Sequence, residues 1–228
     1  MEFPGFLSVL MDQPPVNIPA TPSLSAGTTF TEACFASGTM IATPTGEAAV
    51  ETLNIGDLVM TVDGTAVPVR WLGVLSRPTA ITNGSCAVRI SAGALGDGLP
   101  NADLTVTGGH GMIVDGLVVD AAALVNGTTI TIRPLSEIDN RTTYYHVETE
   151  AHDVIIANGA SSETFIDVTD RRAFNNYDEY VALYGIERII PEMDRPRISA
   201  RRMLPARIKA RLGISDAIED FDAVPASA

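Results

Sequence analysis

Short strand-like runs, each closed by residues that favour turns, follow one another from residue 34 to residue 167. They are rich in Val, Ile, Thr and Tyr, which fit a half-buried pleated surface. The runs are Thr39–Ala42, Asp57–Thr61, Val67–Val74, Ala87–Ile90, Leu104–Val106, Met112–Val114, Thr128–Ile132, Tyr144–Thr149 and Val154–Ala157. The dipeptides between them that favour tight hairpins are Asp63-Gly64, Asn83-Gly84, Asp115-Gly116, Asn126-Gly127 and Asn158-Gly159. This spacing predicts an all-β domain over residues 34–167.

The chain on either side of this zone has a different character. Residues 1–33 contain five prolines and no helical or strand periodicity, so we expect an irregular leader. Residues 168–228 form an arginine-rich tail in which Tyr177–Tyr184 and Pro205–Leu212 read as short helices, each followed by a glycine. We expect this tail to be separate from the β domain, so that its deletion leaves the domain folded.

Charge is distributed unevenly and excludes some partners. The net charge is −13, and all of it lies in residues 1–167, with five basic and 18 acidic groups; the tail holds ten of each. A nucleic acid is therefore not an expected partner, because polyanion binding needs clustered Lys and Arg. We interpret the basic groups of the tail as a solvated helix face that offsets the acidic β domain.

No part of the sequence reads as a membrane anchor or a standard export signal. No apolar run approaches the roughly 20 residues that a membrane-spanning helix needs. No Lys or Arg precedes Arg70, so the positive region of a secretory signal is missing. We therefore expect a chain without a membrane span, either cytoplasmic or exported by a leaderless route.

The residues capable of nucleophilic or acid–base chemistry are few: two cysteines, Cys34 and Cys86, and three histidines. Taken singly, each has an ordinary structural interpretation. Cys34 and Cys86 fit buried apolar positions, and a lone histidine is commonly a core residue bonded to a carbonyl. What gives some of them a functional interpretation is their order along the chain.

Four segments stand in an order that resembles the Hint domains shared by hedgehog autoprocessing proteins and inteins. They are Cys34-Phe-Ala-Ser-Gly-Thr-Met-Ile-Ala-Thr43, Val50-Glu-Thr-Leu-Asn-Ile-Gly-Asp-Leu-Val59, Leu104-Thr-Val-Thr-Gly-Gly-His110 and Tyr145-His-Val-Glu-Thr-Glu-Ala-His-Asp-Val-Ile-Ile-Ala-Asn-Gly159. Trp71-Leu-Gly73 and the arginine-rich tail are similar to the bacterial stand-alone proteins of that family. The resemblance covers roughly residues 34–167 and implies an all-β Hint horseshoe with the Cys34 and Thr107–His110 segments meeting at one end.

The resemblance also implies a chemistry in which the chain is its own substrate. Cys34 attacks the Ala33 carbonyl and forms a thioester, which water or a small nucleophile then opens. In this family the Thr107 hydroxyl hydrogen-bonds the peptide and His110 protonates the leaving amine; His146 or His152 would deprotonate the thiol or activate the second nucleophile. No cofactor is implied.

Departures from the intein pattern limit the expected reaction. Inteins place His-Asn where this chain has Glu163 and Thr164, and they commonly place Asp where His146 stands. Without the asparagine amide, cyclisation that releases the downstream flank is not expected. We therefore expect cleavage at the upstream end without splicing of two flanks.

Three other interpretations stay open at this point. A cysteine and three histidines are zinc-ligand types, although their spacing is not that of a zinc finger. Thr107-Gly-Gly-His110 is also similar to a segment of chymotrypsin-like proteases, but no Gly-Asp-Ser-Gly turn follows it. The third is a catalytically degenerate Hint fold that serves as a binding or secretion-associated module, since 33 residues are a short cargo.

Overall fold

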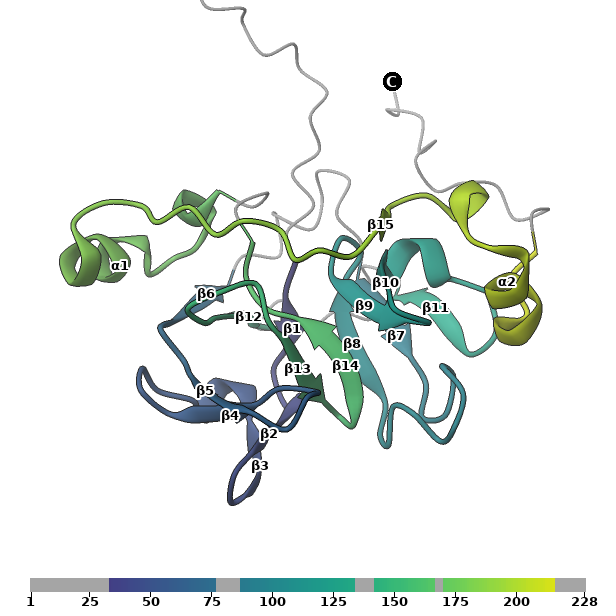
Figure 1. Ribbon diagram of the computed structural model, residues 1–228, viewed down its shortest axis with the longest axis horizontal. Helices are drawn as coiled ribbons and strands as arrows, with labels where there is room; N and C mark the ends of the chain where they lie inside the picture. The colour runs from purple at the N-terminus through teal and green to yellow at the C-terminus, as the bar shows by residue number, and fades with distance from the viewer. Residues whose placement is uncertain (1–32, 77–86, 134–141, 167–169, 216–228) are drawn as a thin grey trace, which may run out of the picture.

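The computed structural model describes residues 33–76, 87–133, 142–166 and 170–215 (Figure 1). Over these ranges the chain is mostly β, as the sequence predicts, and its strands form two larger sheets and a small hairpin. The leader 1–32, the Asn83-Gly84 turn and Cys86 lie outside the described residues. No helix in the described ranges is long and apolar enough to cross a membrane.

The first sheet has six strands and places Cys34 at its centre. Its order is β11 (Ile130–Arg133), β7 (Ala87–Ile90), β8 (Leu104–Thr107), β1 (Phe35–Ala36), β12 (Tyr144–Glu148) and β6 (Trp71–Leu75). All five neighbouring pairs are antiparallel. The short strand β1 therefore lies between β8 and β12, two segments that are far from it in sequence.

The second sheet has seven strands and includes part of the tail. Its order is β15 (Arg197–Ile198), β10 (Leu117–Asp120), β9 (Gly111–Val114), β14 (Ala160–Glu163), β13 (Val154–Ala157), β2 (Met40–Thr43) and β3 (Gly46–Ala49). Two of its hairpins turn where predicted, with positive φ at Asp115-Gly116 and at Asn158-Gly159. A separate hairpin pairs β4 (Leu58–Met60) with β5 (Ala66–Pro68).

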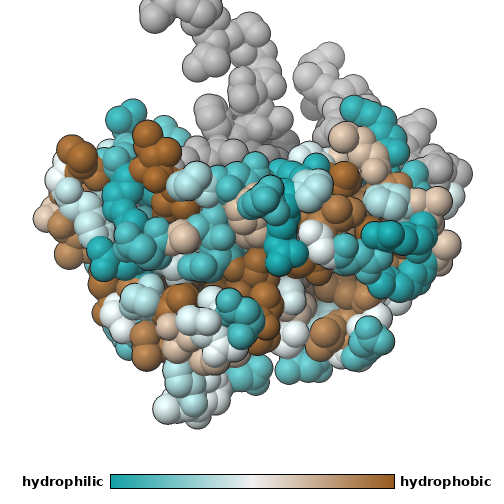
Figure 2. Space-filling view, viewed as in Figure 1, coloured by the Kyte–Doolittle hydropathy of each residue, from teal (hydrophilic) through white to brown (hydrophobic). Residues whose placement is uncertain are grey.

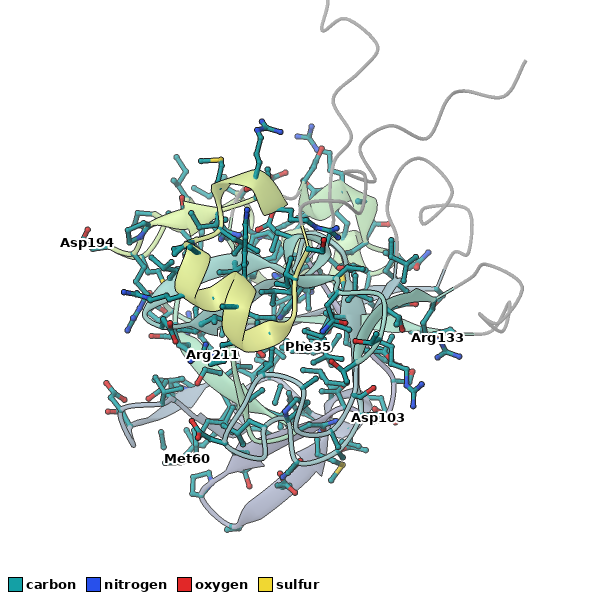
Figure 3. All side chains as sticks on the ribbon, turned by 90° about the vertical axis from the view of Figure 1, so that its right-hand side faces the viewer. Phe35, Met60, Asp103, Arg133, Asp194 and Arg211 are labelled. Atoms are coloured by element: carbon teal, nitrogen blue, oxygen red, sulfur yellow. The ribbon has the colours of Figure 1, made fainter. Side chains whose placement is uncertain are left out.

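Side-chain alternation along the strands divides the interior into two clusters. Phe35 points into a large aliphatic core that also holds Ile41, Val106 and Ile155. Its neighbours Cys34 and Ala36 point to the opposite side, into a smaller aromatic cluster around Trp71, Tyr144, Phe165, Phe174 and Tyr180. In the side view Phe35 lies in the interior behind α2, whereas Asp194 and Arg133 lie at the periphery (Figure 3).

The tail forms the two predicted helices, α1 (Tyr177–Tyr184) and α2 (Ala206–Leu212), and each is capped by a glycine with positive φ. Short 3-10 turns occupy Val50–Thr52, Ala121–Leu124, Arg171–Ala173 and Arg201–Met203. Between the helices the tail crosses the molecule from one side to the other (Figure 1). Hydrophilic groups prevail along this crossing, with exposed apolar side chains at the α1 end, namely Leu183, Ile186 and Ile189 (Figure 2).

The structure differs from our expectation that the tail is separate from the β domain. Phe174 and Tyr180 belong to the aromatic cluster, and Ile208 and Leu212 belong to the aliphatic core. Strand β15 adds to the second sheet by parallel pairing with β10. The apolar positions of the short tail helices are thus buried against the sheets, so the tail contributes to the same interior as the β domain.

Candidate active site

Cys34 lies directly before β1 and is fully buried. The register pairs Phe35 with Val106 on one side and with Tyr145 on the other. Continued by one residue, this register sets Cys34 opposite Thr107 of β8 and opposite His146 of β12. Both are residues that the sequence analysis singled out, and the sheet brings them to either side of Cys34.

A tight turn in Thr107–His110 determines how Thr107 meets Cys34. The Thr107 N–H donates to the Cys34 carbonyl at 2.9 Å, as in a regular antiparallel pair. The Thr107 carbonyl, however, accepts the His110 N–H at 3.1 Å, which closes the turn. The Cys34 N–H donates instead to the Thr107 hydroxyl, at 2.8 Å. Because that N–H belongs to the Ala33–Cys34 peptide, the hydroxyl holds the bond that the predicted reaction would break.

His110 follows this turn and is fully buried. Its ring lies against Phe35, with centroids 4.2 Å apart. Neither ring nitrogen has a hydrogen-bond partner among the described residues, although the Ala33 backbone lies near enough to raise the pKa. Burial dominates and lowers the pKa of His110 from 6.5 to about 4, so the ring is neutral at pH 7.

His146 lies on β12 among aromatic rings and is likewise fully buried. Its ring centroid is 5.1 Å from Phe165, 6.2 Å from the stacked ring of Phe174, and 6.0 Å from the edge-on ring of His110. Neither of its nitrogens has a hydrogen-bond partner among the described residues. Burial, and next the neighbouring His110, lower its pKa well below 6.5. His146 is therefore a second neutral imidazole, and the register puts its side chain on the same side of the sheet as Cys34.

His152 is placed differently, because both of its ring nitrogens are engaged. The Met193 N–H donates to Nδ1 at 3.0 Å, which assigns the proton of the neutral ring to Nε2. Nε2 lies 3.1 Å from Glu163 Oε2 and donates to it. Of the three predicted histidines, the structure thus leaves two with open nitrogens and holds the third in a hydrogen-bonded pair.

Glu163 is the centre of that second group, which sequence reasoning identified only as a departure from the intein pattern. Its buried carboxylate accepts the Gly111 N–H at 2.6 Å and a hydrogen bond from His152, and it forms an ion pair with Arg197. Burial by itself would raise its pKa, but the hydrogen bonds from His152 and Arg197 outweigh that and lower the pKa to about 2. Glu163 is therefore ionised across the neutral range.

No sequence signal pointed to Arg197, because its partners Glu163 and Asp120 lie 34 and 77 residues away along the chain. Within the described ranges, no three residues of the types His, Cys, Asp and Glu are placed to share a metal ion. The chemistry that this arrangement supports is proton transfer around one thiol and one peptide bond.

Comparison with known proteins identifies a family for most of the described β strands. Residues 33–169, more than half of the chain, match the Hint domain family. No curated protein matches the sequence. Among solved structures the chain is similar to the bacterial intein-like domain from Clostridium thermocellum, at 16% identity and a TM-score of 0.45, covering 59% of this chain and 99% of that one.

Two intein structures are similar at a comparable level. The MchDnaB-1 intein has 18% identity and a TM-score of 0.37, covering 56% of this chain and 98% of that one. The Msm DnaB1 intein splicing domain bound with zinc has 20% identity and a TM-score of 0.39, covering 54% and 92%.

Proposed function

The chain belongs to the Hint domain family of self-processing domains, and we propose that it cleaves its own backbone at the Ala33–Cys34 bond without splicing. Sγ of Cys34 attacks the carbonyl carbon of Ala33, the S–C bond forms, and the C–N bond breaks. One proton moves from the thiol to the nitrogen of Cys34, which becomes a free amine. The product is a thioester that holds residues 1–33 on the Cys34 side chain.

Two neutral imidazoles support this proton transfer. His146 lies opposite Cys34 in the register and accepts the thiol proton, while His110 lies beside the scissile peptide and delivers a proton to the leaving nitrogen. The net transfer leaves both rings neutral, because the proton that His146 takes from the thiol replaces the one that His110 gives to the nitrogen; the two ring centroids lie 6.0 Å apart. The Thr107 hydroxyl accepts the N–H of the scissile peptide and so fixes the orientation of that peptide beside the two histidines.

His152, a candidate base in the sequence analysis, takes a different role in this proposal. Because Met193 and Glu163 occupy its two nitrogens, it has none left to receive a proton from the thiol. We assign it to positioning: it holds the Glu163 carboxylate, which in turn anchors the residue after His110.

Contacts at the downstream end of the domain support the absence of splicing in this proposal. Thr164 replaces the intein asparagine, and its hydroxyl accepts the Asp153 N–H at 2.8 Å. The next residue, Phe165, packs into the aromatic cluster together with Phe174. The thioester is therefore resolved by water or a small nucleophile, and the downstream segment stays attached.

The observation that carries the proposal is the hydrogen bond from the Cys34 N–H to the Thr107 hydroxyl, beside a buried histidine whose nitrogens are open. The test is intact mass after incubation with hydroxylamine or a thiol. We expect products of residues 1–33 and 34–228, the second 195 residues long. Cys34→Ala should abolish cleavage.

Matched substitutions on one strand sharpen this test. Thr107→Ala should slow cleavage, whereas Thr105→Ala, two residues earlier on β8, should leave the rate unchanged. Cys86→Ala should also have no effect. An intact mass that stays unchanged in folded protein under strong nucleophiles would support the degenerate binding module instead.

A further inference from the structure

A segment of the tail outside the family match contacts both members of the buried His152–Glu163 pair. Strand β15 pairs with β10, and the Val118 N–H donates to the Pro196 carbonyl at 3.0 Å. This pairing holds the segment Met193–Ile198 over the site. Its Met193 N–H reaches His152 and its Arg197 side chain reaches Glu163.

Arg197 joins three carboxylates through its guanidinium group. It contacts both oxygens of Glu163, Asp120 Oδ1 at 3.0 Å, and Glu192 at the surface. Its side chain is only 19% exposed. A planar fork of donors suits such a multiple contact, because it fixes direction as well as charge.

Glu163 connects this guanidinium to the turn that carries His110. Its Oε1 accepts the N–H of Gly111, the residue directly after His110, at 2.6 Å. A Cβ at Gly111 would lie 2.5 Å from the Glu163 carboxyl carbon, so only glycine allows this approach. The carboxylate therefore helps to fix the backbone that carries the His110 ring, together with the hydrogen bonds that His110 makes to Thr107 and Ala121.

We infer that Arg197 is a positioning residue of the processing site, which clamps Glu163 so that cleavage at Ala33–Cys34 requires the tail to be docked on the β domain. This inference rests on the proposed function and assigns it a control element in the same chain. The tail is thus part of the processing unit, although it lies outside the residues that match the family.

The charges around His110 provide a readout that a merely structural contact would not move. Glu163 raises the pKa of His110, whereas Arg197 and His152 lower it, all against the larger effect of burial. Loss of the Arg197 charge should raise that pKa, and loss of the Glu163 charge should lower it. The ionisable groups near this ring are Cys34 and His146 on the first sheet, Glu163, Asp120 and Arg197 on the second, and His152.

The first arm of the experiment is an NMR titration of His110 in the full chain with Cys34→Ala, which prevents cleavage. The chain has only three histidines, so their ring signals are assignable by substitution. We expect Arg197→Gln to raise the pKa of His110 and Glu163→Gln to lower it. Arg197→Lys keeps the charge, and Arg195→Gln removes an exposed charge two residues away; both should leave the pKa near its starting value.

The second arm measures the rate of thiol-induced cleavage in the chain that retains Cys34. Arg197→Gln should slow cleavage by about 10- to 100-fold, as expected when a reacting group is displaced by roughly an ångström. Arg197→Lys should restore part of the rate, and Arg195→Gln should match the unmodified chain. The pair Glu163→Gln with Arg197→Gln removes both charges and keeps the test usable if a single variant does not fold.

The outcomes separate the two proposals. Equal cleavage rates in Arg197→Gln and Arg195→Gln, or pKa shifts of the same sign in Arg197→Gln and Glu163→Gln, overturn the role of Arg197. Absence of cleavage in the unmodified chain overturns the proposed function. In that case the titration still decides whether the tail is coupled to His110.

Discussion

The two halves of the site differ in the hydrogen bonding of their buried histidines. Around Cys34, the ring nitrogens of His110 and His146 accept or donate no side-chain hydrogen bond within the part of the chain that the structure describes, and the pKa of each ring is lowered. Around Glu163, His152 is equally enclosed but has a partner on each nitrogen. Burial and motif position are thus alike in the two halves, and only the partners differ.

This difference separates groups that move protons from groups that maintain the architecture. A buried polar atom without a partner costs about 1–3 kcal/mol, and folded proteins contain few of them. Among the described residues, His146 has two such nitrogens and His110 has only the Ala33 backbone near its ring, a departure from ordinary packing that points to chemistry. The saturated pair beside them stabilises the fold and leaves no nitrogen open for the thiol proton.

Deletion of the tail should have the largest effect, because it removes contacts from both the Cys34 half and the Glu163 half of the site. A chain ending at residue 169 loses Phe174 beside His146, and Met193 and Arg197 beside the His152–Glu163 pair. It also loses Ile208 and Leu212 from the aliphatic core. We expect an insoluble or molten product by near-ultraviolet circular dichroism. A truncated protein that melts cooperatively would restore our original expectation of a separate tail.

Alanine substitutions of His110 and of His152 should lower the cleavage rate by different amounts. His110→Ala should slow cleavage by about 10²–10⁴-fold, the usual contribution of a general acid or base. His152→Ala should slow cleavage less, after correction for the folded fraction, because His152 has no open nitrogen and acts only by holding Glu163. Mass spectrometry of timed reactions gives both rates. Equal losses at both positions would remove the distinction between the two halves.

Substitution of His146 and of His152 by phenylalanine should change the free energy of unfolding in opposite directions. His146→Phe removes two unpartnered nitrogens inside an aromatic cluster, so we expect the free energy of unfolding to rise by about 1 kcal/mol. His152→Phe leaves Glu163 and the Met193 N–H without a partner and should lower it by about 2–3 kcal/mol. Urea unfolding at pH 7 measures both. A loss of stability in both variants would show that His146 has a partner after all.

Acid should destabilise the protein through the open histidines. The pKa of His110 is about 4 in the folded chain, against a reference value of 6.5 for the unfolded chain. Between pH 6.5 and pH 4 the unfolded chain therefore binds a proton that the folded chain does not bind. Stability is therefore lost as the pH falls from 6.5 toward 4, by about 2 kcal/mol at pH 5 for His110 alone. Asp120, with its pKa raised by burial to about 6, opposes this loss.

Urea unfolding of Cys34→Ala at pH 7 and pH 5 measures this effect without cleavage. His110→Gln in the same background should show a smaller loss between the two pH values. An identical loss in both proteins would mean that the pKa of His110 is the same in the folded and the unfolded chain.

Local signals explain what the sequence predicted well. Hairpins appear at Asp115-Gly116 and Asn158-Gly159, and Tyr177–Tyr184 is helical with Gly185 as its cap, because these features depend on a few adjacent residues. The motif order predicted that the Cys34 and Thr107–His110 segments meet, and the structure places Thr107 and His146 on either side of Cys34.

What the sequence did not predict depends on contacts between distant segments. Strand β15 has two residues, too few to show a period, and its pairing with β10 is set by the fold as a whole. Glu163 was recognised as a replaced residue, but its role requires Arg197, which no local pattern connects to it. The two hydrogen bonds of His152 could not be predicted for the same reason, since its partners are visible only in the fold.

The position of Cys34 between two strands has a consequence for the energetics of the reaction. Cleavage would create an α-amine at the centre of a sheet, still hydrogen-bonded to its neighbours and within reach of the thioester it has just left. Groups held in this way react as if present at about 10⁵–10⁸ M. The amide would therefore re-form faster than the leader escapes, and the resting chain would remain whole. A nucleophile from solution would react with the thioester and make the reversible acyl shift irreversible. The concentration of such nucleophiles would therefore determine how long residues 1–33 stay attached.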